Sequence, residues 1–136
     1  MKIKSLIAIT TVILLASCGA ASDKVEIAKA KDVCEKTITA IDKGEFDNVK
    51  DNYYSTEFSA GTSKEDLTGK FTKLKEACGD LVSYTLKDSS STAEIGFPAQ
   101  AVLTYEVKHS KVTTTEKFVV INQFDSYRIS SHSVNN

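Results

Sequence analysis

The hydrophobic period of this chain changes once, near Leu81, from about 3.6 residues to 2. Before Leu81, apolar residues recur at the spacing of one helix face. After it, apolar and polar residues alternate, as they do along a strand with one buried face. Helices that precede strands, instead of alternating with them, are typical of an α+β domain. We therefore expect three N-terminal helices packed on a curved antiparallel sheet of about four strands.

Local signals set the expected boundaries of these elements. Asp23 is placed to cap the first helix, and glycines at 44 and 79 suit the ends of the first and third helices. The expected helices are 24–43, a short segment from Phe46 to Tyr53, and a helix from Thr62 or Ser63 to Cys78. Residues 55–62 and 88–92 are expected as loops. The expected strands are 81–87, 101–108, 112–122 and 127–134.

The N-terminus has the pattern of a secretory signal. Lys2 and Lys4 precede an apolar run, residues 6–15, which is half the roughly twenty residues that a membrane-spanning helix needs. The run ends in Leu-Ala-Ser-Cys, which resembles the lipobox of bacterial lipoproteins. The resemblance implies a signal peptide of residues 1–17, cleavage before Cys18 and acylation of Cys18, including palmitate. The alternative is an ordinary signal peptide followed by a chance cysteine.

The residues after Cys18 refine the expected location. Gly19 stands where the inner-membrane retention signal of the lipoproteins it resembles has Asp, so we expect an outer-membrane anchor facing the periplasm of a Gram-negative bacterium. Residues 18–23 form a short lipidated tether that reaches at most about 17 Å. Residues 24–134 then form a single domain. The lipid bilayer, contacted through acylated Cys18, is the first expected partner.

The charge balance argues against a nucleic-acid partner. The chain of 136 residues has 17 basic and 18 acidic residues. Removal of residues 1–17 takes away two lysines and no acid, which leaves a net charge of −3. A nucleic-acid-binding protein is expected to have a concentrated basic face instead.

Cys34 and Cys78 remain as an even pair once Cys18 is assigned to the lipid. Both lie on the apolar stripes of their expected helices, and an exported protein works in an oxidising compartment. We therefore expect a disulfide between them, a buried pair of free thiols and a metal site being the alternatives. No Cys-x-x-Cys spacing and no nearby histidine supports a metal site.

The order of elements resembles a known family. The chain is similar to the nuclear transport factor 2-like fold, also called SnoaL-like, in the order helix, short helix, loop, helix and long meander. In this comparison, residues 38–46 are the junction between the first two helices, and residues 116–128 are the final hairpin. The resemblance covers residues 24–134 and is closest to small exported members of unknown function. It implies a cone with a pocket at its open end, where enzymes of this superfamily place an Asp or His base beside a Tyr or Asp donor.

No catalytic pair, cofactor or metal site can be named from the sequence. His109 and His132 are expected to face solvent, with His132 on the same strand face as Arg128 and Ser130. The candidates to line a pocket are Tyr53, Tyr54, Tyr84, Tyr105 and Tyr127. We therefore expect a non-catalytic binding module for an envelope protein or a small apolar ligand. The alternatives are an immunity or inhibitor lipoprotein against a periplasmic toxin, and a small isomerase or dehydratase that uses an acid such as Asp42 or a histidine.

Overall fold

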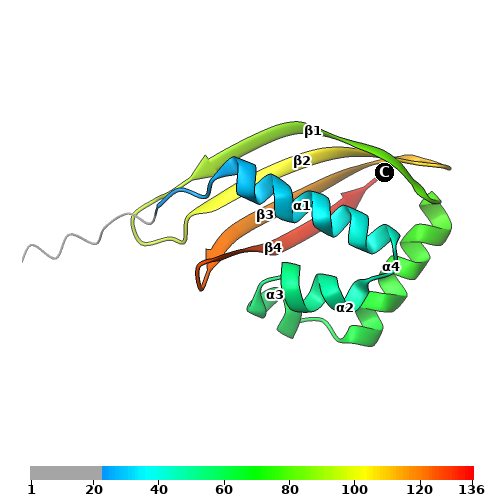
Figure 1. Ribbon diagram of the computed structural model, residues 1–136, viewed down its shortest axis with the longest axis horizontal. Helices are drawn as coiled ribbons and strands as arrows, with labels where there is room; N and C mark the ends of the chain where they lie inside the picture. Colours follow the sequence, from blue (N-terminus) through cyan, green and yellow to red (C-terminus); the bar gives the residue numbers. More distant parts are fainter. Residues whose placement is uncertain (1–22) are drawn as a thin grey trace, which may run out of the picture.

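A four-stranded antiparallel sheet covers a layer of helices in the computed structural model, which describes residues 23–136 (Figure 1). Cys18 and the expected signal peptide lie outside the described residues. The helical segments are α1 (Ile27–Asp42), α2 (Phe46–Asn48), the π-helical η1 (Val49–Tyr53), α3 (Thr56–Ala60) and α4 (Lys64–Cys78). The strands are β1 (Leu81–Thr92), β2 (Gln100–His109), β3 (Thr113–Gln123) and β4 (Ser126–Asn135). The helices precede the strands, so the expected α+β class is confirmed.

Two long helices, α1 and α4, form where the apolar spacing predicts them. Ser63 caps α4, because its Oγ accepts a hydrogen bond from the backbone N–H of Asp66 at 3.1 Å. Gly44 and Gly79 follow the two helices with φ of 76° and 84°, which favours glycine at both positions. A Cβ at Gly79 would lie 2.0 Å from Oγ of Ser110, so this turn also needs a glycine for space. The start of α1 differs from expectation, since Glu26 and not Asp23 is its N-cap.

The expected count of three helices is wrong. The loop expected at residues 55–62 contains α3, whose N-cap is Ser55: its Oγ accepts from the backbone N–H of Phe58 at 3.2 Å. A tertiary contact places this helix, because the N–H of Ser55 donates to the carbonyl of Ile129 in β4 at 2.8 Å. Tyr54 is extended and forms a parallel bridge with the same residue. A helix of five residues with a long-range anchor leaves little periodic signal in the sequence.

The sheet is a meander in the order β1-β2-β3-β4, and it arches over α1. α1 packs against β1, β2 and β4. β1 runs on to Thr92 through the segment 88–92 that was expected to be a loop, because its polar residues pair with β2 from Gln100 to Thr104. Backbone pairing with a neighbouring strand thus outweighs the polar composition of that segment.

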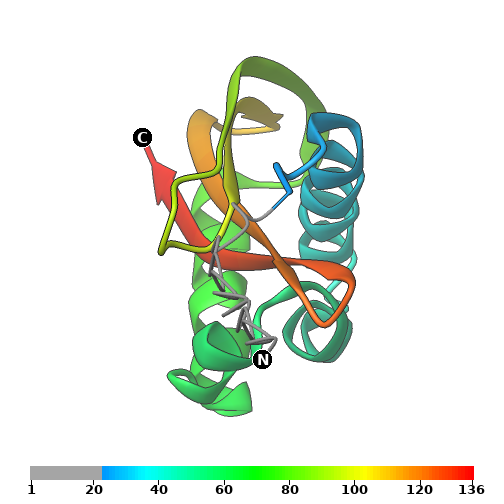
Figure 2. The same ribbon diagram turned by 90° about the vertical axis from the view of Figure 1, so that its left-hand side faces the viewer.

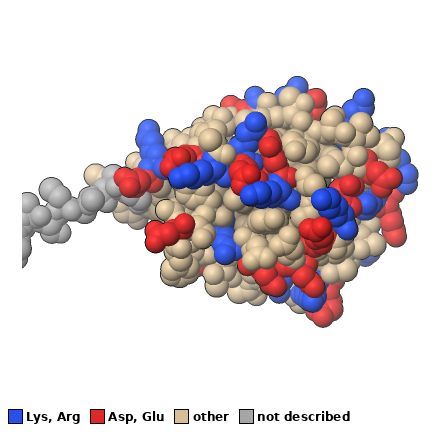
Figure 3. Space-filling model, viewed as in Figure 1, with Lys and Arg blue, Asp and Glu red and all other residues tan. Residues whose placement is uncertain are grey.

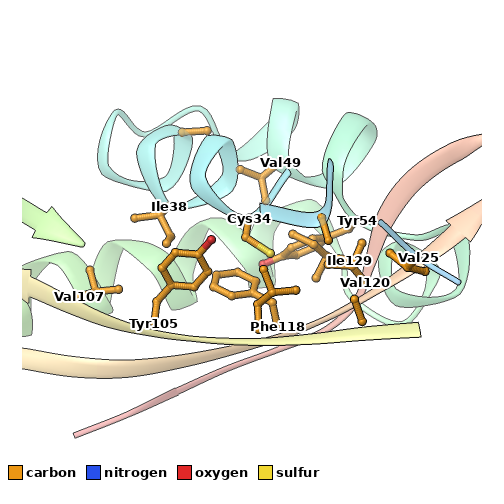
Figure 4. Packing of buried hydrophobic residues seen from close by; sticks show 14 of the residues in the cluster. Val25, Cys34, Ile38, Val49, Tyr54, Tyr105, Val107, Phe118, Val120 and Ile129 are labelled. Atoms are coloured by element: carbon orange, nitrogen blue, oxygen red, sulfur yellow. The ribbon is translucent and has the colours of Figure 1, made fainter. Parts of the chain in front are cut away.

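The space between the helices and the sheet is filled by side chains. Figure 4 shows Cys34 projecting from α1 toward Tyr105 and Phe118 of the sheet. All three of these residues are fully buried, as are Leu103 and Ile129. Aromatic rings meet edge to face here, with the centroids of Tyr105 and Phe118 at 5.9 Å. The concave face of the sheet is therefore a packed core over most of its length.

Candidate functional site

Glu116, His132 and Tyr54 form a buried hydrogen-bonded chain at the inner face of the sheet. The Glu116 carboxylate lies 2.8 Å from Nε2 of His132, and the Tyr54 hydroxyl lies 3.0 Å from Nδ1 of the same ring. The side chains of Glu116 and His132 are only 5% and 2% exposed. The ring of Phe118 stacks on His132 with centroids 4.2 Å apart. The chain of contacts uses both nitrogens of His132, which holds the ring in one orientation.

A β-bulge places His132 in the core, and the expectation that it faces solvent is wrong. Val119 pairs with Ser131 but Val120 pairs with Ile129, so Ser130 is an extra residue in β4. The extra residue moves His132 to the buried face, whereas strict alternation groups it with Arg128 and Ser130. His109 is also mostly buried, with its side chain 13% exposed, because it ends the inner face of β2.

A small cavity lies beside this hydrogen-bonded chain, between the C-terminal parts of α1 and α4 and the inner face of the sheet. Its volume is about 20 Å³, which is room for about one water molecule. Asp42 and Lys75 lie on its rim, where Asp42 accepts from the N–H of Leu81 at 2.9 Å and Lys75 donates to the Asp42 carbonyl. Asp42 therefore holds the end of α1 to the start of β1. The cavity is lined by Ile38, Ile41, Asp42, Leu74, Lys75, Gly79, Leu81, His109, Glu116 and His132.

Cys34 and Cys78 do not form the expected disulfide: both are free thiols and both are buried. The reason is their position along the helices. Cys34 faces the centre of the sheet, where burial and then the nearby Glu35 carboxylate raise the pKa of its thiol. Cys78 ends α4, where burial and then Glu116 raise its pKa while Lys111 opposes the shift. Sharing one core thus does not bring the two sulfurs together.

The five tyrosines expected as candidates do not line one pocket. Tyr105 is fully buried, and its hydroxyl lies 3.5 Å from Glu35; burial is the main cause that raises its pKa. Tyr53 and Tyr84 line a shallow surface hollow beside α1, and Tyr127 lines another, where its hydroxyl accepts from the N–H of Glu26 at 3.1 Å. The tyrosine that joins the polar chain is Tyr54, whose pKa is raised by burial and then by Glu116.

Glu116 is not among the residues expected from the sequence to form a site. Its position in the sequence indicates that it is buried, because alternation along β3 places Glu116 on the inner face between Thr114 and Phe118. A carboxylate on the buried face of a strand requires a partner in the core. His109 and His132 were the available partners, but the bulge that brings His132 to Glu116 has no signature in the sequence.

The hollow lined by Tyr127 has a volume of about 620 Å³, and a second hollow of that size lies on the outward side of the sheet, between the β1–β2 loop and the start of α3. We call this second hollow the groove; its volume is about 620 Å³, within the range of small-ligand sites. Gln100 and Ile121 pair across β2 and β3 on the outward face and form its floor. The complete lining is Ser55, Glu57, Thr92, Glu94, Phe97, Pro98, Gln100, Ile121, Asn122, Gln123 and Ser130.

Gln123 fixes the α3 wall of the groove. Its Oε1 accepts from the backbone N–H of Thr56 at 2.9 Å, and its Nε2 donates to Glu57 at 2.8 Å. Hydrogen bonds from its own backbone N–H and then from Gln123 hold the pKa of Glu57 below its usual range. The groove therefore combines the apolar side chains of Phe97 and Ile121 with a carboxylate that stays ionised near neutral pH.

No protein-family model and no curated protein matches the chain. Within residues 23–136, no helix combines the length and apolar composition that crossing a membrane requires. Over the same range, no group of three or more His, Cys, Asp or Glu side chains is arranged to hold a metal ion. The groove and the buried chain are therefore the two features of the described residues that bear on function.

Proposed function

We propose that this chain is a lipid-anchored outer-membrane lipoprotein of the periplasm, and that its domain is a non-catalytic binding module of the nuclear transport factor 2-like type. The lipobox-like ending at Cys18 supports the anchor. The order of the helices and the arch of the sheet over α1 support the fold type. The groove supports binding, and it is the observation on which the proposal depends.

The contrast between the groove and the interior favours binding over catalysis. The cavity next to His132 and Glu116 has a volume of about 20 Å³, whereas pockets for small molecules occupy about 300 Å³ or more. The nitrogens of His132 are both engaged by neighbours. The groove, in contrast, has ligand-sized volume and lies open on the surface.

The lining of the groove indicates the chemistry of its occupant. Phe97, Pro98 and Ile121 offer apolar surface, while Glu57 and Glu94 offer negative charge. An apolar body that carries a basic group complements this lining. We therefore propose as occupant a segment of an envelope protein, or a small ligand, of that chemistry.

The groove is tested with a photo-crosslinking amino acid at Gln100, in cells that export the full chain. We expect one recurring product, a protein adduct or a defined mass increment, at Gln100. The matched control is Lys108, which is exposed at the other end of the same strand. Identical products at both positions, or none at Gln100, would contradict the groove as a binding site.

A matched pair of charge substitutions tests the apolar part of the groove floor, Ile121. Ile121→Asp places an acid in the groove, and Val119→Asp places one on the same outward face of β3, outside the groove lining. We expect Ile121→Asp to abolish the Gln100 product and Val119→Asp to retain it. The anchor is tested separately: Cys18→Ser should remove palmitate labelling and release the chain from the membrane fraction.

A further inference from the structure

Three large apolar side chains are exposed on two turns of the sheet. Ile95 and Phe97 lie in the β1–β2 loop with 77% and 66% of their surface exposed, and Phe124 lies in the β3–β4 turn with 90% exposed. Both turns lie at the same end of the sheet, and residues of both, Phe97 and Gln123, line the groove. We call Ile95, Phe97 and Phe124 the apolar tip.

The apolar tip lies at the end of the molecule where the described chain begins. Figure 1 shows the β1–β2 loop and the β3–β4 turn at the same end as the first described residues, with the C-terminus toward the other end, and Figure 2 shows the loop and the turn on either side of that end. Contacts agree with the pictures: the Ser91 hydroxyl donates to the Val25 carbonyl at 2.7 Å, and Asp23 lines a hollow with Asp125. Any tether that precedes Asp23 therefore starts next to the apolar tip.

Phe124 is unfavourable for the isolated fold in two ways: its side chain is exposed and its backbone has a positive φ. Phe124 and Asp125 have φ of 51° and 59°, and they form a two-residue turn between the paired residues Gln123 and Ser126. Such turns favour Asn and Gly, because other side chains are crowded when φ is positive. A phenylalanine here adds backbone strain to an exposed apolar surface. A residue that costs stability in the isolated fold is explained when something outside the fold contacts it.

We propose that the apolar tip rests on the lipid bilayer, with the domain standing on the membrane by its two hairpin turns. The proposal rests on the anchor at Cys18, from which a tether of about five residues reaches at most about 17 Å. That length keeps the tip close to the bilayer. Exposed aromatic and aliphatic side chains on turns at one end of the molecule suit the boundary between headgroups and acyl chains.

Tryptophan fluorescence tests this contact directly, because the chain contains no tryptophan. Phe97→Trp and Phe124→Trp are made singly in the lipidated protein and reconstituted in phosphatidylethanolamine–phosphatidylglycerol vesicles whose acyl chains carry bromine. We expect both variants to lose fluorescence to the brominated lipid and to emit at shorter wavelength than in detergent-free buffer. Val82→Trp is the control, since Val82 is 58% exposed near the start of β1, at the opposite end of the molecule.

The outcomes separate the tip from the anchor. If the protein floats with the vesicles but tryptophans at 97 and 124 are quenched no more than at 82, the tip contact is overturned and the anchor stands. If the protein stays off the vesicles and Cys18 carries no acyl group, the anchor is overturned and the tip contact with it. A concentration-dependent emission shift without lipid would instead assign the tip to contact between two copies of the chain.

Discussion

Replacement of Glu116 should lower stability more than replacement of an exposed acid of the sheet, because its carboxylate is buried against His132. Glu116→Ala leaves Nε2 of His132 buried without a partner, which we expect to lower the free energy of unfolding by about 1–3 kcal/mol in urea titrations. Glu116→Gln keeps an acceptor oxygen and should lose less. Glu106→Ala is the control, since it removes only an exposed ion pair with Lys87 worth about 0–1 kcal/mol.

If Glu116→Ala is as stable as Glu106→Ala, the buried chain does not hold the core together. A carboxylate that can be removed at no cost in stability would then be a candidate for ligand binding, and the water-sized cavity beside it would need to open. The result therefore also weighs the isomerase or dehydratase alternative against the binding module.

The two buried cysteines should be unreactive thiols. Burial raises the pKa of both Cys34 and Cys78 above the usual value of 9.0. In a Cys18→Ser variant at pH 8 we expect slow reaction with a chromogenic disulfide reagent in the native state, because little thiolate is present and access is blocked. Two thiols should titrate after unfolding in urea without reductant. No thiol at that stage would mean that the sulfurs pair in the cell.

Hydrophobic periodicity predicts the helices and strands that bury one regularly spaced apolar face in the core. α1, α4 and the inner alternation of β2 follow from apolar spacing in the sequence. α3 and the end of β1 do not, because their stability comes from partners distant in the chain, Ile129 for the first and Gln100 for the second. The groove shares this property: its lining comes from both groups of elements, so no single stretch of sequence identifies it.

The bulge in β4 is the element-scale feature that builds the buried chain, and deletion of Ser130 tests it. In the native chain, strict alternation from Ile129 would turn His132 outward, and the extra residue returns it to the inner face. Deletion of Ser130 joins Ile129 to Ser131, so a regular ladder keeps His132 opposite Phe118 and within reach of Glu116. We therefore expect a folded variant whose free energy of unfolding falls by no more than about 3 kcal/mol, measured by thermal and urea unfolding. Ser130→Ala keeps the residue count and should cost less than about 1 kcal/mol. An unfolded deletion variant would show that the fold requires the bulge itself, and not only the face on which His132 lies.

For the whole molecule, buried proton-bearing groups set the response to alkaline pH. Burial raises the pKa of Tyr54, Tyr105 and Cys34 in the folded state. The unfolded chain therefore releases these protons at lower pH than the native one, and the native state binds more protons above about pH 9. The contribution of these groups to stability is complete below pH 9 and is lost as pH rises.

We expect the urea midpoint to fall as pH increases from 9 to 11. Tyr105→Phe removes one such group, so its loss of stability above pH 10 should be shallower by up to about 1.4 kcal/mol per pH unit. Tyr127→Phe is the control, since Tyr127 lies in a surface hollow. Parallel curves for the wild-type chain and Tyr105→Phe would mean that Tyr105 ionises as readily in the folded protein as in the unfolded one.

Charged and large apolar side chains occupy different parts of the molecular surface. Along α1, lysines alternate with acids in ion pairs such as Lys36–Asp32 at 2.6 Å, and Figure 3 shows the two signs mixed over this face. The largest exposed apolar side chains of the described residues are instead at the apolar tip, apart from Val82. If the tip rests on the bilayer, the adjacent groove opens close to the membrane surface, where its occupant would be met.

The β3–β4 turn allows a test in which stability and membrane contact change in opposite directions. Phe124→Asn with Asp125→Gly installs the residues that a turn with two positive φ values favours. Relief of the strain should raise the free energy of unfolding by about 1 kcal/mol in urea. The same change removes an aromatic ring from the tip, so a tryptophan at position 97 should be quenched less by brominated lipid. A variant that is less stable than the wild-type chain would mean that Phe124 packs on the fold, and its exposure would no longer point to the membrane.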